Sequence, residues 1–246
     1  MGKSFGKWTK HKFLSQNKKL ARYIPETNLL TEKTFHEFLE KYGEAIVKPS
    51  IGSLGNKIFK ITDIGNDHYE IHGANRIEKI AGKKNAFDLV RQNVSKRKNI
   101  IQKVIPLAKK NDYPFDLRVM VQKEKDASEW VITGMAAKVA AKGFFITNAA
   151  REVLTVEDAI NNSSINLQFL KTKSVVKELE KVSLLIAHTL QEHYPQEHEM
   201  GIDFGVDDEG RVWIIEVNMR PNISLFKVLR EKSMLEEILR VRESHK

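Results

Sequence analysis

The sequence predicts an α+β protein, arranged either as one large domain or as two small lobes. Segments with the two-residue period of strands and segments with the 3.6-residue period of helices occur without the regular alternation that produces a parallel sheet. The length of 246 residues suits either arrangement. Hydrophobic residues make up 41% of the chain and charged residues 30%, so we expect an ordinary globular protein with a substantial core.

In the first part of the chain we expect two helices followed mainly by strands. Apolar positions predict a helix over residues 7–22, and Pro25 prevents it from continuing. Thr31 is a suitable N-cap for a second helix over residues 32–41. The next expected elements are strands at 45–49, 57–63, 68–72 and 100–104 and a helix at 84–95.

The second part of the chain is richer in strands. Alternating patterns predict them at 116–122, 130–139 and 144–147. Thr155 can cap a further helix, and residues 172–192 form the longest segment with helical period. A hairpin follows, and the charged tail at 225–241 is expected to be helical.

The most informative pattern lies in this hairpin. Residues 200–206 and 211–218 alternate as strands, and the sequence DDEG at 207–210 is typical of the turn between them. Alternation puts apolar side chains on one face and oxygen-bearing side chains on the other. The apolar row is Ile202, Phe204, Val206, Trp213, Ile215 and Val217, and the opposite row includes Asp203, Glu216 and Asn218.

A register follows if both apolar rows face one core. The expected pairs are Ile202 with Ile215 and Phe204 with Trp213, which puts Asp203 diagonally beside Glu216. Two carboxylates and the Asn218 amide are hard oxygen ligands, which suit Mg2+ or Mn2+ held together with nucleotide phosphates. The alternative is the solvated outer face of an ordinary hairpin. Arg220 and Pro221 follow at once and favour the metal site.

Upstream segments have features that suit a phosphate group. Lys48 lies at the end of an apolar strand, and the loop at 50–55 offers backbone N–H groups for an anion. The alternative is a plain loop between two strands. Arg118, beside Asp116 in an alternating strand, can be aimed at a phosphate or can form a structural ion pair. Lys138 lies among small residues that a ligand could approach, or it extends along the surface to water.

Several classes of site are excluded or unsupported. The absence of cysteine excludes disulfides, thiolate metal sites and a cysteine nucleophile. The phosphate-loop motif GxxxxGK[ST] and the dinucleotide-binding motif GxGxxG are absent, and no third ligand accompanies the histidines. No apolar run is long enough to cross a bilayer, so a cytoplasmic location is expected. The net charge of +9 favours an anionic partner, which could be a nucleotide, an acidic peptide or a nucleic acid.

Taken in order, these segments resemble the ATP-grasp superfamily, and most of all its spore-coat-associated YheC/YheD branch. Glutathione synthetase and the RimK-type ligases are more distant in this resemblance. The matching stretches are KWTKHKFL at 7–14, YIPET at 23–27, IVKP at 46–49 with Gly52 and Gly55, PFDLRV at 114–119, ITN at 146–148, GID at 201–203 and IEVNMRP at 215–221. The resemblance implies an α+β ATP-grasp fold, in which two subdomains with mixed or antiparallel sheets clamp a nucleotide.

The resemblance also implies roles for individual residues. It implies one ATP-grasp domain over 1–246, with a nucleotide-clamping subdomain at about 30–105 and the metal-binding remainder at 1–29 and 106–246. Lys48 and a closing loop with Ser50, Gly52, Ser53 and Gly55 would contact the phosphates of ATP, and Gln102, Lys103 and Val104 would meet the adenine edge. Arg118 and Lys138 would lie near the γ-phosphate and the acyl phosphate. Asp203, Glu216 and Asn218 would hold Mg2+ or Mn2+, with Asn148 and Arg220 beside them.

The implied activity is ATP-dependent ligation of a carboxylate to an amine through an acyl phosphate. An amino acid, a peptide or another carboxylate-bearing molecule would be the substrate, and spore association is a further implication. Two departures from the family's pattern stand out. The lobe that usually precedes the Lys7 stretch is missing, replaced or supplied by a partner subunit, and Glu152 and Val153 stand in place of a usual Gly-Gly pair.

These departures keep other functions open. A phosphotransferase, or a nucleotide-binding module of a larger assembly, would retain the ATP site without ligation. A basic nucleic-acid-binding protein is a third and weaker reading, because it leaves the oxygen-ligand hairpin without a purpose.

Overall fold

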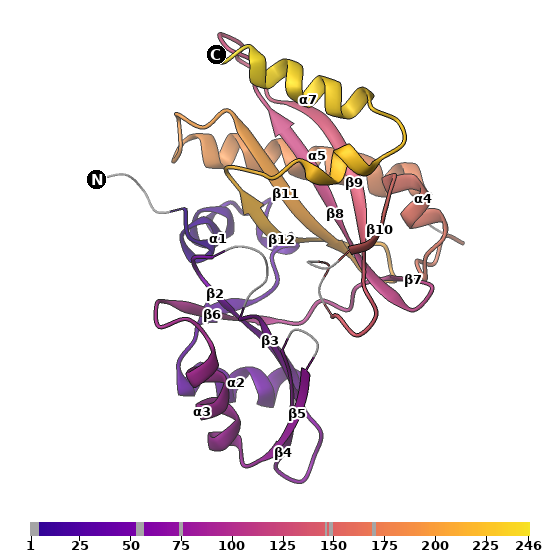
Figure 1. The fold of residues 1–246 in the computed structure, drawn as a ribbon. Coiled ribbons are helices and arrows are strands. Elements are labelled where there is room, and N and C mark those ends of the chain that lie inside the picture. Colours follow the sequence, from indigo (N-terminus) through magenta and orange to yellow (C-terminus); the bar gives the residue numbers. More distant parts are fainter. Residues whose placement is uncertain (1–4, 53–56, 74–75, 146, 148–149, 169–170) are drawn as a thin grey trace.

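Two antiparallel sheets, each packed against helices, form the body of the protein (Figure 1). The computed structural model describes residues 5–52, 57–73, 76–145, 147, 150–168 and 171–246. The N-terminal sheet lies in the lower half of Figure 1 and the C-terminal sheet in the upper half. The α+β class predicted from the sequence is confirmed.

The N-terminal sheet has all its strands antiparallel. Its order is β1 (Thr27–Leu29), β6 (Asn99–Lys103), β2 (Glu44–Pro49), β3 (Phe59–Asp63), β4 (His68–Gly73) and β5 (Arg76–Ala81). Helices α2 (Glu32–Tyr42) and α3 (Lys83–Asn93) bury Phe35, Phe38 and Val90 against it. The Thr31 cap is confirmed: its hydroxyl accepts from the Thr34 N–H, and the Thr34 hydroxyl accepts in turn from the Thr31 N–H.

The C-terminal sheet is also antiparallel. Its order is β10 (Ala150–Leu154), β9 (Val131–Ala140), β8 (Tyr113–Gln122), β11 (Glu199–Val206) and β12 (Val212–Asn218), with β7 (Lys109–Lys110) beside β8. The helices around it are α1 (Lys7–Gln16), α4 (Val156–Asn161), α5 (Thr172–Gln191), α6 (Ser224–Val228) and α7 (Ser233–Glu243). Thr155 caps α4 as expected, accepting from the Asp158 N–H.

Strand β8 shows why the C-terminal sheet, the larger of the two, can hold a functional site. Leu117, Val119 and Val121 are fully buried in the main core, which includes α5, as the alternating pattern predicted. On the opposite face Met120 packs beneath α6 and α7. Arg118 shares that face nearer the start of the strand and lines a cavity.

The sequence misplaced some elements. The first helix ends at Gln16 rather than near Arg22, because the Asn17 side chain accepts from the Lys19 N–H, and a short 3-10 helix follows at Ala21–Tyr23. No strand includes the described residues of 144–147, and Ile146 lies outside the described residues. Strands β1, β5 and β10 were not expected. The predicted helical tail is two helices, α6 and α7.

The register predicted for the C-terminal hairpin is wrong. The observed pairs are Ile202 with Val217, Asp203 with Glu216, Phe204 with Ile214 and Gly205 with Trp213. A β-bulge leaves Ile215 without a partner, so strict alternation fails at this point. Val212, Ile214 and Val217 are therefore the buried residues of β12. Ile215 and Glu216, although adjacent, both line the cavity that contains Lys48.

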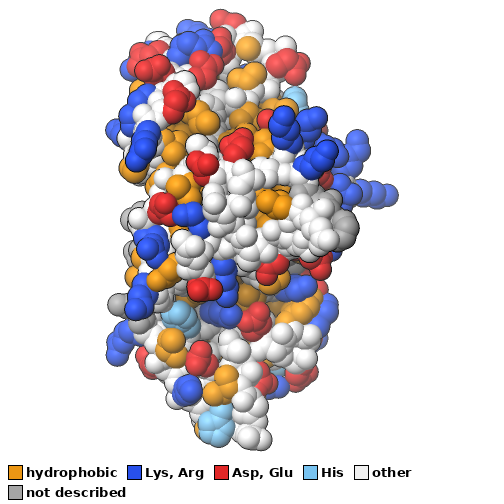
Figure 2. Space-filling model, turned by 90° about the vertical axis from the view of Figure 1, so that its right-hand side faces the viewer, with side chains coloured by type: hydrophobic (Ala, Val, Ile, Leu, Met, Phe, Trp, Pro, Cys, Tyr) orange, Lys and Arg blue, Asp and Glu red, His pale blue; other side chains and the backbone are white. Residues whose placement is uncertain are grey.

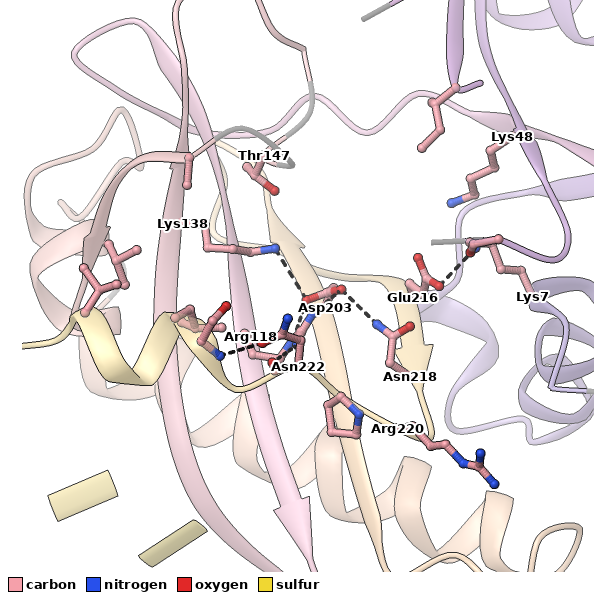
Figure 3. A pocket seen from close by; sticks show the side chains of 18 of the residues that line it. Lys7, Lys48, Arg118, Lys138, Thr147, Asp203, Glu216, Asn218, Arg220 and Asn222 are labelled. Atoms are coloured by element: carbon pink, nitrogen blue, oxygen red, sulfur yellow. Dashed lines mark hydrogen bonds and ion pairs between the residues drawn. The ribbon is translucent and has the colours of Figure 1, made fainter. Parts of the chain in front are cut away.

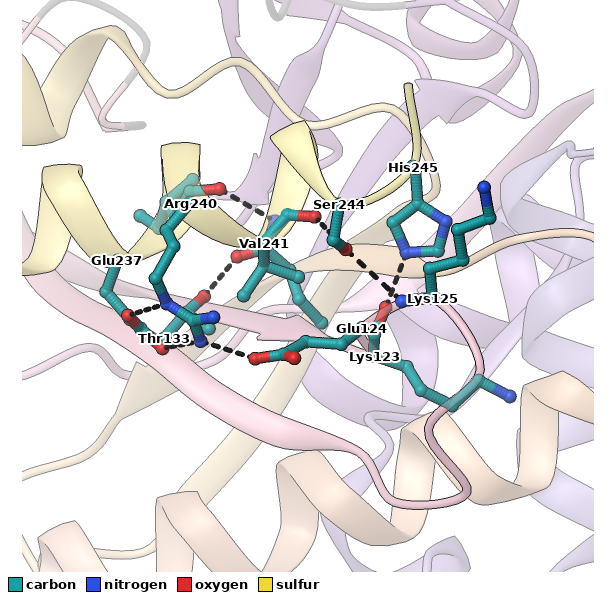
Figure 4. A network of polar contacts seen from close by, with 11 residues as sticks. Lys123, Glu124, Lys125, Thr133, Glu237, Arg240, Val241, Ser244 and His245 are labelled. Atoms are coloured by element: carbon teal, nitrogen blue, oxygen red, sulfur yellow. Dashed lines mark hydrogen bonds and ion pairs between the residues drawn. The ribbon is translucent and has the colours of Figure 1, made fainter.

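Helix α7 is fastened to the sheet by polar contacts along its length (Figure 4). At its end the Ser244 hydroxyl accepts from the Lys125 N–H at 3.2 Å, and the His245 ring donates to the Lys123 carbonyl at 2.7 Å. Arg242 donates to both carboxylate oxygens of Glu199, at 2.8 and 3.0 Å, and to the Pro221 carbonyl at 3.0 Å. Arg242 thus ties α7 to the start of β11 and to the loop that follows β12.

We expect Arg242→Gln to destabilise the protein by about 1 to 3 kcal/mol, because it removes charge-assisted hydrogen bonds in a half-buried place. Chemical unfolding followed by circular dichroism measures this change. Arg240→Gln, on the same helix but with exposed ion pairs to Glu237 and Glu124, is the control and should cost below about 1 kcal/mol. Equal losses for the two variants would contradict the assignment.

Candidate functional site

A deep cleft separates the two sheets. It comprises two cavities of about 600 and 680 Å3. Both are within the size range of small-molecule sites. The residues that line both cavities are Lys48, Ile58, Lys138, Thr147, Asp203 and Glu216. The cavities are therefore two ends of one cleft, with a charged middle.

The central strands of the larger sheet bring together a buried charge cluster. β8 and β11 pair with Arg118 directly opposite Asp203. The Arg118 guanidinium donates to both carboxylate oxygens of Asp203, at 2.6 and 2.9 Å. On β9, the Lys138 ammonium lies 3.9 Å from Asp203 and 3.1 Å from Asp116. The Thr147 hydroxyl donates to the other oxygen of Asp116.

The pKa values of the two acids of this cluster, Asp116 and Asp203, are shifted in opposite directions. Burial opposes ionisation of Asp203, but the charges of Arg118 and Lys138 outweigh it and hold its pKa below the usual value. Burial raises the pKa of Asp116, and Asp203 reinforces this while Lys138 opposes it. Asp203 is therefore the more readily ionised acid of the pair.

Strand β12 brings two further oxygen ligands to the same wall. The Asn218 amide donates to Asp203 at 3.3 Å. Glu216 pairs with the Lys7 ammonium at 3.1 Å and is about one quarter exposed. Figure 3 shows Arg118, Lys138 and Asn218 turned toward Asp203, with Glu216, Lys7 and Lys48 further along the cavity.

Lys48 is buried at the boundary of the two sheets. Its ammonium donates to the Gln102 side chain at 2.8 Å and lies 3.4 Å from the Ile215 carbonyl. Gln102 in turn donates to the Thr27 hydroxyl at 2.7 Å, so its amide is fixed from both sides. Burial lowers the pKa of Lys48 to about 8, although Glu216 opposes the change. The cation is thus held where nearby carboxylates compensate only part of its burial.

Helix α1 contributes two lysines that sequence analysis did not single out. The Lys7 ammonium donates to the Gly52 carbonyl at 2.8 Å while pairing with Glu216. Lys10 is almost fully buried, and its ammonium has no hydrogen-bond or ion-pair partner in the described ranges. Burial lowers its pKa to about 8, against the attraction of Glu216. Both lysines lie in the stretch KWTK, where a spacing of three residues puts them on one helix face.

The loop after β2 is anchored to α1. The Ser50 carbonyl accepts from the Lys7 N–H at 2.7 Å, and the Ser50 hydroxyl accepts from the Trp8 N–H at 3.2 Å. Ser50 lines neither end of the cleft, whereas Gly52 lines the first cavity. Ser53 and Gly55 lie outside the described residues, as does Asn148.

The second cavity extends away from the charged cluster toward the segment after β6. Gln102, Lys103 and Val104, the residues named for the adenine edge, line it. The apolar side chains that form a compartment with them are Ile46, Ile58, Ile77, Ile105, Pro106, Leu107, Pro114, Phe144, Phe145 and Ile215.

Arg220 lines the first cavity but does not join the charge cluster. It is exposed, extends away from Asp203 and Lys138 in Figure 3, and has no hydrogen bond or ion pair within the described part of the chain. The loop that carries it is nevertheless held firmly. Pro221 packs on Gly201, where an added Cβ would come within 2.5 Å, and the Asn222 carbonyl accepts from Arg118 at 3.2 Å.

The chemistry of the donors fits a hard divalent cation bound together with phosphate oxygens. Asp203, Glu216 and Asn218 supply two carboxylates and an amide on one wall of the cleft. Among the described residues no group of three acidic or histidine side chains could hold a metal without such help. Lys48, Arg118 and Lys138 line the same cavity, so cationic groups that could meet phosphates lie beside these ligands.

Two antiparallel sheets with lysines, an arginine and oxygen ligands gathered between them define an ATP-grasp protein. The chain belongs to the YheC/D like ATP-grasp family, which it matches over residues 2–242. It is 27% identical over 232 residues to the endospore coat-associated protein YheD of Bacillus subtilis, covering 90% of this chain and 49% of YheD. It is 26% identical over 222 residues to YheC of the same organism, covering 87% of this chain and 59% of YheC. The chain thus spans about half the length of these relatives.

Solved structures share the fold at low sequence identity. An N5-carboxyaminoimidazole ribonucleotide synthetase in complex with ADP aligns with a TM-score of 0.56 and 13% identity, covering 96% of this chain and 51% of that one. The D-alanine-D-alanine ligase of Coxiella burnetii aligns with a TM-score of 0.56 and 13% identity, covering 98% and 58%. In the described part of this chain, no helix combines the length and apolarity needed to span a bilayer.

We expect Lys10→Met to stabilise the protein by about 1 to 3 kcal/mol at pH 7, because it removes the cost of burying an uncompensated cation. The folded-state pKa of Lys10 is about 8, below its ordinary value of 10.5. The cost is therefore fully present below pH 8, and the wild type recovers as pH rises from 8 toward 10.5.

Urea unfolding of both proteins at pH 7 and pH 10 measures this difference. The advantage of Lys10→Met should shrink at the higher pH. Lys12→Met, on an exposed position of the same helix, is the control and should change stability little at either pH. A destabilised Lys10→Met variant would show that the ammonium has a compensating partner.

Proposed function

We propose that this chain is the ATP-grasp part of an ATP- and magnesium-dependent carboxylate–amine ligase that acts on an amino acid or peptide. One observation carries the proposal. Asp203, Glu216 and Asn218 line the same inter-sheet cavity as Lys48, Arg118 and Lys138. A triphosphate with its divalent cation needs both kinds of group side by side.

The nucleotide would lie along the cleft with its base in the second cavity. Gln102, Lys103 and Val104 would meet the edge of adenine there, and Ile215 would contact its face. The phosphates would reach Lys48 and Lys7, and the loop with Ser50, Gly52, Ser53 and Gly55 would close over them. Mg2+ or Mn2+, held by Asp203, Glu216 and Asn218, would neutralise phosphate charge.

The proposed reaction has two steps. An oxygen of the substrate carboxylate bonds to the terminal phosphorus while the bond to the bridging oxygen of ADP breaks. The amine then bonds to the acyl carbon, the carbon–oxygen bond to phosphate breaks, and the released phosphate takes up the amine proton. Arg118 and Lys138 would stabilise the charge that develops on the transferred group, and Asn148 and Arg220 would lie beside the metal ligands.

Two alternatives compete with ligation. A phosphotransferase, or a nucleotide-binding module of a larger assembly, would use the same ATP site. Glu152 and Val153, in place of a usual Gly-Gly pair, motivate this alternative, since both line the first cavity. A nucleic-acid-binding function is disfavoured, because basic and acidic side chains are interspersed over most of the face in Figure 2.

The setting of the protein is part of the proposal. Two curated relatives carry names that associate them with the endospore coat, and we propose a spore-associated role here as well. Since the chain spans about half their length, a further segment or a partner subunit would complete the substrate site.

Glu216→Gln should lower magnesium-dependent ADP release by about 100-fold or more, because it removes a charged metal ligand. Asp203→Asn should act in the same direction. ADP release is measured with Mg2+, ATP and mixtures of amino acids or dipeptides, and nucleotide affinity is measured by calorimetry on the same samples. Glu209→Gln, in the exposed turn of the same hairpin, is the control and should leave both unchanged.

The products separate the proposal from its alternatives. An amide product with ADP supports a ligase, and a phosphorylated product would support a phosphotransferase instead. Tight nucleotide binding without turnover would support a binding module. Unaltered nucleotide binding and turnover in Glu216→Gln and Asp203→Asn would refute the metal site itself.

A further inference from the structure

The end of the cleft farthest from the base compartment has an apolar lining that nucleotide binding does not explain. Beyond the charged middle, the first cavity is bounded by strand β10, helix α6 and the loop between β12 and α6. We call this lining the apolar wall. Its members are Ala150, Val153, Pro221, Leu225 and Val228.

The apolar wall is open to the cleft. Val228 is 66% exposed, the highest value among the exposed large hydrophobic side chains of the described residues, and Leu225 and Val153 are half-buried. Single exposed apolar residues are common on protein surfaces. Here three of them bound the same cavity, next to Arg118 and Lys138, so a bound group would cover them together.

The apolar wall is also held in place before any ligand binds. Phe226, between Leu225 and Val228 on α6, is fully buried against Met120, Ala136 and Ile238. Its ring lies so close to Gly134 that an added Cβ there would be 2.9 Å away. The loop before α6 is fixed by Arg118 and Arg242. A rigid apolar surface loses little entropy on binding, which favours specific recognition.

The charged side chains beside the apolar wall indicate which polar group the ligand has. Within the described residues Arg220 has no ion-pair partner, whereas Glu152, the acid of β10 that lines the cavity, is paired with Lys110 at 2.8 Å. Arg118 and Lys138 line the same cavity as the apolar wall. A ligand with a carboxylate next to an apolar side chain would match both the cationic groups and the apolar wall.

We infer that the apolar wall binds the side chain of an amino acid or short peptide whose reacting carboxylate lies against Arg118 and Lys138. The inference rests on the proposed function for the identity of the reacting group. The first cavity has a volume of about 600 Å3 and must hold the terminal phosphate as well as the substrate, so the substrate must be smaller than this volume. The substrate class is therefore a carboxylic acid with a branched or aliphatic group beside its carboxylate.

Calorimetry with two matched carboxylates tests the inference without requiring turnover. N-acetyl-L-leucine and N-acetyl-L-serine are titrated into the whole protein, with and without Mg2+ and a non-hydrolysable ATP analogue. We expect the leucine derivative to bind about 10-fold or more tightly than the serine derivative, because only its side chain fits the apolar wall.

A pair of matched variants identifies the surface responsible. Val228→Thr keeps the shape of the side chain but adds a hydroxyl, and should reduce the preference for leucine by about 3-fold or more. Val131→Thr makes the same change at a 42% exposed valine outside both cavities, and should leave the preference unchanged. Both positions are exposed, so folding is expected to survive, and thermal unfolding verifies this.

The outcomes distinguish this inference from the proposed function. Equal binding of the two probes, binding of neither, or equal effects of Val228→Thr and Val131→Thr would overturn the inference, even if amides form from ATP. A leucine preference lost only in Val228→Thr supports the apolar wall, even if no amide is formed, and the ligase proposal alone would then fail.

Discussion

The arrangement of the cleft depends on the buried ion pair between Arg118 and Asp203. It joins the two central strands of the larger sheet at directly opposed positions, with both oxygens of the carboxylate engaged. The same guanidinium holds the Asn222 carbonyl and so fixes the loop after β12. Removing one partner of such a buried pair typically costs about 3 to 5 kcal/mol, because the other charge is left uncompensated. Strand register, loop position and the charge of the cleft therefore have one origin.

Around this pair the cleft contains more positive than negative charge. Lys7, Lys10 and Lys48 approach from α1 and β2, and Glu216 is the acid to which all three are linked. The lowered pKa values of Lys10 and Lys48, both to about 8, show that nearby carboxylates do not offset the burial of these ammonium groups. A polyanion would do so. The protein thus carries an electrostatic cost in its free form, which the proposed phosphate-bearing ligand would relieve.

Local rules predicted a good part of this structure. The Thr31 cap, the alternating faces of β8 and the turn after β11 all follow from short-range patterns. The register of the hairpin did not, because alternation cannot foresee the extra residue at Ile215. Lys7 was also missed, since its contacts with Gly52 and Glu216 join segments that are distant in sequence. Tertiary packing creates such contacts, whereas strand patterns alone had already pointed to the residues that line the first cavity: Lys48, Arg118, Lys138, Asp203, Glu216 and Asn218.

The β-bulge in β12 determines which side chains of this strand face the cleft. Because Ile215 is unpaired, it and Glu216 emerge on the same side, one toward the apolar compartment and one toward the charged middle. Their neighbour Asn218 lies beyond, beside Asp203. Strand β12 therefore sets the distance between an apolar contact, Ile215, and an acidic contact, Glu216, which are adjacent in the chain. Deleting the extra residue would turn either Ile215 or Glu216 toward the core. The backbone of β12, rather than any side chain, therefore sets the spacing between the two compartments.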